Sequence, residues 1–437
     1  MSSTPASERL SLAPQAPVAP DAPAARADSG PGSVELVAMV ASLMAMNALA
    51  IDVMLPGLPA IARHFDVVEA NHQQFVIFAY IVGFGVPQLF WGPLTDRYGR
   101  RNALFVALGG YALASGAAIF ASNFAMFLAL RFLQGVFAAG CRVIAVALVR
   151  DLYAGPMMAR TMSLVMTVFM VVPITAPMIG QAILAIAPWQ ATFGLLAVVG
   201  VLVLVWSFTR LAETLPADSR NPISVGRIAR NYWMIVTTPV TLGYMVASGL
   251  LFGALFAFIP SSEQIFREVF HQGDTFVYWF AAIAFTLSLA NFANSRLVRR
   301  FGMRRIGHAA LIGFTVLSFV LYVAMRVFGE RLEIFFPLFA LAFALFGLIG
   351  ANFSALAMEP LGKVAGTGSA AYGFATTTVS GAIGAVIGLA YDGSTAPLLL
   401  GFVALGVCSL LAVIATERGK FLSRPAEVLT QKGGEGA

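Results

Sequence analysis

Charged residues divide this chain into long apolar runs separated by short polar segments. Eight stretches of 21 or more residues contain no Asp, Glu, Lys or Arg, and a membrane-spanning helix needs about 20 mainly apolar residues. The longest stretch, residues 161–209, has room for two crossings because Pro188 and Trp189 supply a break and an interfacial aromatic ring. The pattern therefore predicts twelve membrane-spanning helices, over residues 35–61, 73–94, 103–122, 124–148, 161–186, 190–210, 233–259, 275–296, 306–327, 333–358, 367–391 and 396–416.

The composition supports this interpretation. Of the 437 residues, 59% are hydrophobic and 11% are charged, whereas soluble domains carry about 25% charged residues. The fold class we expect is therefore an all-α polytopic membrane protein.

Residues 1–33 contain six prolines and no apolar block, so they indicate a disordered tail rather than a signal peptide. Cys141 and Cys408 fall within expected spans, which argues against a disulfide framework or a cysteine metal site.

The arginines and lysines predict which helix ends face the cytoplasm. With the N-terminus inside, 21 of the 27 basic residues fall in cytoplasmic segments and 4 on the opposite side, and short cytoplasmic loops are the ones enriched in Lys and Arg. We therefore expect both termini in the cytoplasm. The formal net charge of +6 follows from this topology and does not indicate nucleic-acid binding, because the basic residues are dispersed over loops.

Two turns that lie 203 residues apart indicate two related halves. Residues 97–101, with the sequence RYGRR, lie between spans 2 and 3, and residues 300–304, with the sequence RFGMR, lie between spans 8 and 9. The second copy has Arg299 where the first has Asp96. This placement predicts two pseudo-symmetric six-helix bundles. The expected organisation is a cytoplasmic tail over 1–33, bundles over 34–210 and 233–416, a cytoplasmic linker over 211–232 and a second tail over 417–437.

The first turn has a physical use that its residue types explain. Glycine permits a tight connection, arginines bond to carbonyls and lipid phosphates, and a carboxylate can face the positive N-terminus of a neighbouring helix. The plain alternative is that any cytoplasmic hairpin attracts arginines. The turn resembles the signature G-x-L-x-D-R-x-G-R-R of the major facilitator superfamily. The matching positions are Gly92, Leu94, Asp96, Arg97, Gly99, Arg100 and Arg101.

The resemblance implies a transporter with a central cavity between two rocking bundles. It also implies that these motif residues form a conformational latch, in which the acid helps to close the cytoplasmic side against span 11. We predict that Asp96 meets residues 366–370 at the start of span 11, and that Asp96→Asn weakens transport without preventing insertion.

Asp52, Arg131 and Tyr80 place ionisable groups inside the predicted spans. A buried charge is costly unless it is neutralised or paired, so such residues are functional candidates. Counted from the outer helix ends, Asp52 lies about 9–13 Å deep, Arg131 about 12 Å and Tyr80 about 13 Å, so the three can share one cavity layer. A helix-end role for Asp52 and plain packing for Tyr80 are the alternatives. Arg142 lies about 16 Å nearer the cytoplasm, where snorkelling and a cavity role both remain open.

Other polar and aromatic residues inside the spans are candidates for a substrate cavity. Polar side chains in an apolar span must find partners inside the bundle, and aromatic or unbranched side chains accept substrates of varied shape. Each candidate also has a plain alternative in helix packing, and Glu359 is either a gate contact or a solvated helix end. The cavity candidates are Asn47, Tyr80, Gln134, Phe252, Asn352 and Phe374.

Several segments extend the resemblance to proton-coupled drug exporters of this superfamily and to their bicyclomycin-resistance branch. They contain the R-x-x-Q-G pattern of span 4, the end of span 1 and a degenerate form of the antiporter pattern of span 5, in which Gln181 replaces a usual glycine. The similar segments are LRFLQG at 130–135, IDVMLPGLPAI at 51–61, Ala176 and Pro177 with Gly180, RDLY at 150–153 and the glycine-rich run at 365–388.

By position, the resemblance implies that Asp52 binds and releases the coupling proton and that Arg131 tunes this event. Burial disfavours the charged carboxylate and a guanidinium favours it, so a conformational change that alters either effect alters proton affinity. Some related exporters carry a further acid eight residues earlier, where this chain has Met44, and this leaves the proton stoichiometry open.

We therefore predict a secondary active transporter in the bacterial inner membrane that exports small hydrophobic or amphipathic drugs in exchange for protons. Its partners are the drug-like substrate, the proton and the lipid bilayer; we expect a monomer, no nucleic acid and no cofactor beyond the proton-motive force. A transporter of a metabolite with the same fold is the first alternative. A polytopic membrane enzyme is more remote, because the sequence contains no HExxH, GxSxG or P-loop pattern.

Overall fold

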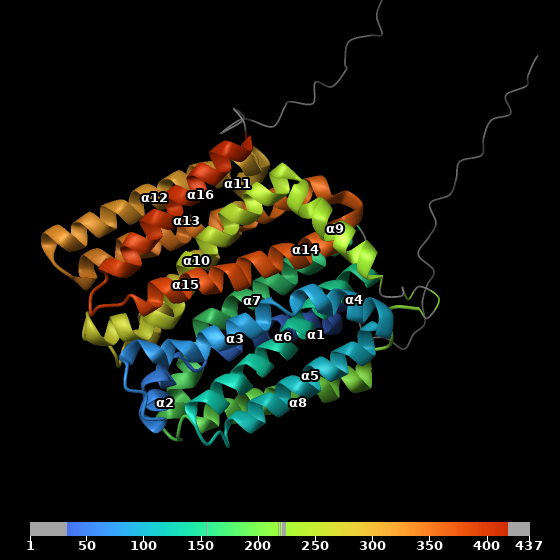
Figure 1. Cartoon of the computed structure of the whole chain (residues 1–437), viewed down its shortest axis with the longest axis horizontal. Coiled ribbons are helices and arrows are strands. Elements are labelled where there is room, and N and C mark those ends of the chain that lie inside the picture. The colour runs from blue at the N-terminus through green and yellow to red at the C-terminus, as the bar shows by residue number, and fades with distance from the viewer. Residues whose placement is uncertain (1–32, 154, 217, 219, 221–223, 418–437) are drawn as a thin grey trace, which may run out of the picture.

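The computed structural model describes residues 33–153, 155–216, 218, 220 and 224–417, and every regular element within them is a helix. The expected tails over 1–32 and 418–437 lie outside the described residues. In Figure 1 the helices of the first half form the lower bundle, from blue to green, and those of the second half form the upper bundle, from yellow to red. We call the end of the molecule that carries the Gly99 turn, at the right of Figure 1, the basic end, and the other end the opposite end.

The first half contains helices at all six expected spans, and breaks divide the first two. Asp52 ends the first helix at a turn just before Pro56, and span 2 bends by 43° where Pro87 precedes its second part. The elements are α1 (Ser33–Asp52), η1 (Leu55–Gly57), α2 (Leu58–His64), η2 (Ala70–Gln74), α3 (Phe75–Gly85), α4 (Gln88–Tyr98), α5 (Arg100–Ala118), α6 (Phe124–Leu152), α7 (Gly155–Leu184) and α8 (Gln190–Arg210).

The second half repeats this plan after a linker helix. Its fifth span contains a short π-helical stretch, η5, between two α-helical parts. The elements are the linker helix α9 (Val225–Thr237), α10 (Pro239–Glu268), α11 (Phe276–Phe301), α12 (Met303–Phe328), α13 (Leu332–Met358), η4 (Glu359–Val364), α14 (Ala365–Phe374), η5 (Ala375–Val379), α15 (Ser380–Leu389) and α16 (Ala396–Glu417).

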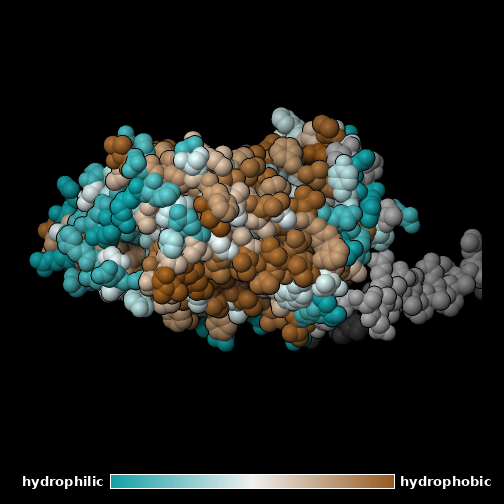
Figure 2. Space-filling model, turned by 90° about the horizontal axis from the view of Figure 1, so that it is seen from below, coloured by the Kyte–Doolittle hydropathy of each residue, from teal (hydrophilic) through white to brown (hydrophobic). Residues whose placement is uncertain are grey.

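The helices have the lengths and surfaces of membrane spans. Within the described residues, ten helices are long and apolar enough to cross a membrane, and the bent pair of α3 and α4 makes eleven. α5, whose run of Gly, Ala and Ser is less apolar, takes the place of the expected third span and packs against α6 and α8. Figure 2 shows hydrophobic residues across the middle of one face and hydrophilic residues at both ends. The molecule is therefore a multi-pass membrane protein with the all-α fold that the sequence predicts.

The seventh span differs most from its predicted bounds. Residues 233–237 belong to α9, and the span itself runs from Pro239 to Glu268 rather than over 233–259. Thr238 has extended backbone angles, as expected for a residue before proline, and Pro239 starts the new helix. At the other end the helix continues through Pro260, because the polar residues that follow are buried and bonded there rather than exposed in a loop.

The two short turns found in the sequence have the same geometry. Gly99 has φ 91° and ψ 154°, and Gly302 has φ 80° and ψ 154°, and each of them precedes the next helix. This region of backbone space is essentially restricted to glycine. The common conformation supports the predicted relation between the two halves.

Among the described residues, two pairs of spans make the most extensive contacts between the halves. α7 packs against α11, and the helices of span 2 pack against those of span 11. Three glycines of span 11 permit this approach, because a Cβ added to any of them would clash with a side chain of span 2. The facing pairs are Gly373 and Gln88, Gly381 and Ile81, and Gly388 and Gln74. Spans 2 and 11 are therefore in contact along most of their length.

Candidate functional site

Arg131 is fully buried in the first half and bonds to neighbouring helices. Its Nε donates to the Val76 carbonyl of α3 at 3.1 Å, and Nη2 donates to the Ala50 carbonyl of α1 at 3.2 Å. Nη1 donates to Oε1 of Gln134 on its own helix. The guanidinium also lies over the ring of Tyr80, with 4.6 Å from Cζ to the ring centroid. We use the name Arg131 cluster for Arg131, the carbonyl groups of Ala50 and Val76, and the side chains of Tyr80 and Gln134.

The spacing of the R-x-x-Q-G pattern is explained by these contacts. Gln134 lies one turn after Arg131, accepts its hydrogen bond, and donates from Nε2 to Oγ of Ser115 on α5 at 2.7 Å. A Cβ on Gly135 would clash with the carbonyl of Tyr80, so glycine is what lets α6 and α3 meet at their backbones. The pattern therefore places Arg131, its hydrogen-bond acceptor Gln134 and the close helix contact at Gly135 on one face of α6.

Tyr80 connects the Arg131 cluster to α1. Its hydroxyl donates to Oδ1 of Asn47 at 2.9 Å, and the tyrosine itself is fully buried. The structure thus brings together four of the residues singled out from the sequence, from spans 1, 2 and 4. These are Asn47, Tyr80, Arg131 and Gln134.

Asp52 lies beside this cluster but is not bonded to it. It is the last residue of α1 and is 4% exposed. Among the described residues its carboxylate forms no hydrogen bond and no ion pair, although Arg131 bonds to Ala50 only two positions earlier. A Cβ on Gly180 of α7 would clash with the carbonyl of Val53, so span 5 approaches the chain directly at this break. The acid is therefore buried at the end of α1 and pairs with no cation among the described residues.

Arg142 lies further along α6, at the boundary between the halves. Its guanidinium is 5.6 Å from the ring centroid of Phe84, and that ring is stacked on Tyr80 with 6.1 Å between centroids. The two arginines of α6 are thus linked by two stacked rings of α3. Arg142 has no acidic partner in the part of the chain that the structure describes, and it interacts electrostatically with Tyr372 of the second half. Its side chain is partly buried, and a cavity role for it stays a prediction.

The candidates of the second half lie apart from one another. Asn352 is buried and donates to Oδ1 of Asn294 at 2.8 Å, which joins spans 10 and 8. Phe252 packs edge to face on Phe346, with 5.2 Å between ring centroids. Phe374 borders an apolar groove of about 370 Å³ between span 2, α9 and the helices of spans 7 and 11. Within the described residues, none of the three bonds to the Arg131 cluster.

The Gly99 turn is organised around Arg100. This guanidinium is 3% exposed; Nη1 lies 2.6 Å from Oδ1 of Asp96 and donates to Oγ1 of Thr95 at 2.7 Å, and Nε donates to Oδ2 of Asp151 at 2.9 Å. The sequence reasoning missed Asp151, which ties the end of span 4 to this turn. The signal was present in the segment RDLY, which places an acid at the basic end of a span.

Glu213 is a second residue that the sequence reasoning missed. Its carboxylate accepts the backbone N–H groups of Arg100 at 2.9 Å and of Arg101 at 3.2 Å, so it caps the first turn of α5. A Cβ on Gly99 would clash with this carboxylate. The cap is supplied from a position 113 residues away, and no local pattern in the sequence indicates it.

The latch residues bond chiefly within the first half in this structure. α4 packs against α14, but the bonded partner of Asp96 is Arg100 of its own half. Gly92 lies inside α4 with open space where a Cβ would be, and Arg97 is exposed beside Tyr98. The contact between Asp96 and the start of span 11 stays a prediction.

Two other side chains reach across the halves at the basic end. A Cβ on Gly366 would lie 2.8 Å from Nη1 of Arg150, so this arginine touches the start of span 11. The hydroxyl of Tyr232 on α9 donates to the Leu89 carbonyl at 3.1 Å. Burial raises the pKa of Tyr232 to about 12, so the phenol keeps its proton and this bond at physiological pH.

A family profile, relatives in sequence and a solved structure all match this chain. The sequence profile of the Major Facilitator Superfamily matches residues 40–385. A bicyclomycin resistance protein homolog of Haemophilus influenzae is 31% identical over 380 residues, which are 85% of this chain and 93% of that protein. The multidrug resistance protein MdtL of Escherichia coli is 32% identical over 257 residues, which are 57% of this chain and 63% of MdtL.

A solved structure shows the same fold. The D-xylose-proton symporter matches with a TM-score of 0.67 and 14% identity, over 89% of this chain and 97% of that one. At this identity the likeness concerns the fold alone. Together with the sequence matches, it confirms the resemblance expected from the turn between spans 2 and 3 and from the patterns of spans 1, 4 and 5.

Proposed function

This chain belongs to the major facilitator superfamily, and from that premise we propose that it exports small hydrophobic or amphipathic drugs in exchange for protons. The proposed setting is the bacterial inner membrane, with both termini and the basic end in the cytoplasm and one chain as the working unit. Relatives named for bicyclomycin resistance and multidrug resistance support the substrate class. The observation that carries the coupling is the carboxyl group of Asp52, which is buried beside the Arg131 cluster and has no bonded partner among the described residues.

Asp52 is proposed to bind one proton in each cycle. An isolated carboxylate in an apolar site is costly, so the carboxyl group is stable there when it carries a proton. When the bundles rock, a shorter distance to Arg131 or access to water stabilises the carboxylate, and the proton leaves to the side that is then open. The break between α1 and η1 lets the acid move without displacing the whole span.

Arg131 is proposed to act by position rather than by titration. Its bonds to α1 and α3 hold the guanidinium in place between these helices while the acid moves, and the stacked rings of Tyr80 and Phe84 extend this arrangement to Arg142. Arg142 faces the second half and is proposed to contact polar groups of the substrate. The aromatic side chains of the second half, including Phe252, supply apolar contact.

The test is transport by purified protein in liposomes that carry a pH gradient, with ethidium as the probe. Wild type should accumulate the dye against its gradient when protons flow the other way. Asp52→Asn should lose accumulation at least tenfold while it still exchanges dye with dye, because exchange needs no net proton transfer. Asp66→Asn, an exposed aspartate beyond the same span, is the matched control and should behave as wild type.

Two outcomes would contradict the proposal. If Asp52→Asn accumulates the dye as wild type does, Asp52 is not the coupling group. If the wild type is driven by protons but moves only sugars or carboxylates from a panel that includes bicyclomycin and chloramphenicol, the protein is a metabolite transporter of the same fold.

A further inference from the structure

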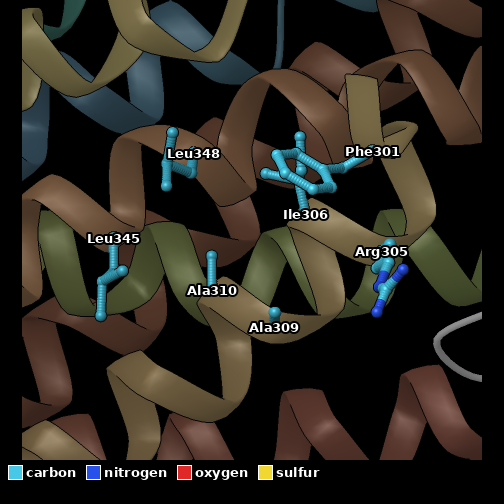
Figure 3. Close-up of a pocket in the computed structure, with 7 residues that line it drawn as sticks. All are labelled: Phe301, Arg305, Ile306, Ala309, Ala310, Leu345 and Leu348. Carbon is cyan, nitrogen blue, oxygen red and sulfur yellow. The ribbon is translucent and has the colours of Figure 1, made fainter. Parts of the chain in front are cut away.

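The start of α12 lies beside an apolar groove of about 350 Å³ that no part of the transport mechanism uses. Its walls are formed by the end of α11, the first turns of α12 and the middle of α13. Figure 3 shows Ile306, Ala309 and Ala310 along α12, Leu345 and Leu348 on the facing helix, and Arg305 at one end of the row. The groove is therefore apolar along its length and cationic at its basic end.

Arg305 differs from the arginine that precedes it. Arg304 bonds to Glu359 and to Glu417, at 3.1 Å in each case, so its charge is balanced within the protein. Arg305 is exposed, lines the groove, and has no acidic partner among the residues that the structure describes. The second charge of this pair is thus available to a ligand outside the protein.

The surroundings of Arg305 favour an anion. It lies in the first turn of α12, where backbone N–H groups point away from the helix and the helix dipole is positive. Arg300 is exposed at the end of α11, and its guanidinium covers the ring of Phe301, which lines the groove, at 5.2 Å. No acidic residue lies between positions 296 and 305 to offset this charge.

The position of the groove in the membrane defines the chemistry of its occupant. It is lined by α11, α12 and α13 of the second half, each long and apolar enough to cross a membrane, and the exposed side chain of Phe301 forms part of its wall. A ligand that fits both the apolar walls and Arg305 has an apolar chain of several carbons and a negative head group at the level of Arg305. We propose that the groove binds an anionic phospholipid of the leaflet at the basic end, with its phosphate on Arg305 and one acyl chain along Ala309 and Ala310.

The proposal predicts lipid selectivity at one site. Native mass spectrometry of the purified full chain, titrated with dioleoyl phosphatidylglycerol or dioleoyl phosphatidylcholine, measures retention of each lipid. Wild type should retain the first bound phosphatidylglycerol more strongly than phosphatidylcholine. Arg305→Gln should lower phosphatidylglycerol retention about fivefold, the effect of one basic residue at an anionic surface. Ala309→Phe should fill the groove and lower retention of both lipids.

Two arginines serve as controls. Arg326→Gln changes an exposed arginine at the other end of the same helix, and Arg299→Gln changes an exposed arginine of the same basic region that does not line the groove. Both variants should retain phosphatidylglycerol as wild type does. Glycerol phosphate, which has the anionic group without the chains, should not compete at concentrations at which the lipid saturates. Size-exclusion chromatography checks that each variant remains folded.

Three outcomes would overturn the proposal. Unchanged retention in both Arg305→Gln and Ala309→Phe would show that the lipid binds elsewhere. An equal loss in Arg299→Gln would show that the attraction is spread over the basic region rather than placed at the groove. A dimer that Ala309→Phe dissociates would show that the groove receives a second copy of this chain.

Discussion

In both halves the first and fifth spans meet at a glycine, but the residues next to this contact differ between the halves. In the first half, Gly180 of span 5 meets the Val53 carbonyl of span 1. In the second, Gly384 of span 11 meets the backbone of Phe256 and Ala257 in span 7. Phe256 lies 203 residues after Val53, the same spacing that relates the two glycine turns. The contact therefore belongs to the repeated fold and not to one function.

The residue before this contact distinguishes the halves. Asp52 precedes Val53, whereas Leu255 stands at the corresponding position of span 7. The fourth helices differ in the same way. α6 carries Arg131 and Gln134, and α13 carries a row of stacked phenylalanines with 4.7 Å between successive centroids at Phe335, Phe339 and Phe343. At these corresponding positions the common scaffold carries polar and ionisable side chains in the first half and apolar side chains in the second, in line with the proposed roles of the two halves.

The largest effect on transport should follow from removing the charge of Arg131. Arg131→Gln leaves the carbonyls of Val76 and Ala50 without their donor, and each unsatisfied buried group costs about 1–3 kcal/mol. We expect transport to fall below detection and the midpoint of thermal unfolding in detergent to drop. Arg131→Lys should restore folding better than transport, because a single ammonium cannot reproduce the planar set of donors. Full transport by Arg131→Gln would remove Arg131 from the mechanism.

The glycine contact offers a direct comparison of the halves. Gly180→Ala and Gly384→Ala each add a methyl group against a neighbouring backbone, and overpacking of this kind costs about 1–3 kcal/mol. We expect both variants to lose stability. Gly180→Ala should lower proton-driven accumulation more than dye exchange, because it displaces the segment that carries Asp52, whereas Gly384→Ala should lower both equally. Gly109→Ala, with open space at its Cβ, is the control for added helix propensity. Equal behaviour of the two glycine variants would contradict the division between halves.

The sequence predicted the fold well because its dominant constraint is local. Each span needs only a run of apolar residues, and the short turns around Gly99 and Gly302 fix the order of neighbouring helices. The least accurate boundary was that of span 7. There the linker helix and the span form one continuous apolar stretch in the sequence, and Pro239 separates them. At the far end of the span, polar residues that are buried lengthen the helix to Glu268.

The candidate site was predictable only in part. The R-x-x-Q-G pattern identified Arg131 and Gln134, because those residues lie on one face of one helix, and the structure adds the backbone contact at Gly135. Pairings between distant segments were not accessible. Depth estimates suggested that Asp52 and Arg131 share a layer, but depth does not determine direction around a helix, and the two side chains are not paired. The pairings of Asp151 and Glu213 with Arg100 were missed for the same reason, since Arg100 lies far away in sequence, although the segment RDLY did show an acid at position 151.

A smaller effect is expected at the turn between spans 2 and 3. Gly99→Ala forces a side chain into a conformation that costs about 1–3 kcal/mol and displaces the Glu213 carboxylate from the start of α5. We expect lower thermal stability with the proton dependence of transport unchanged, because the turn does not contact Asp52. Glu213→Gln tests the cap separately and should cost less, since an amide oxygen still accepts hydrogen bonds. A changed proton dependence in Gly99→Ala would connect the turn to coupling.

The smallest effect should appear in the second half, as a change in substrate preference. Phe252→Leu keeps most of the apolar volume, so folding should lose less than about 1.5 kcal/mol. It removes the edge-to-face contact with Phe346 and an aromatic face, and an aromatic pair contributes about 0.5–1.5 kcal/mol beyond area burial. Efflux of an aromatic dye should therefore fall about two- to tenfold relative to an aliphatic substrate, with proton dependence unchanged. Phe319→Leu, on the exposed side of α12, should change neither. A loss of proton coupling in Phe252→Leu, with substrate preference preserved, would reverse the roles assigned to the two halves.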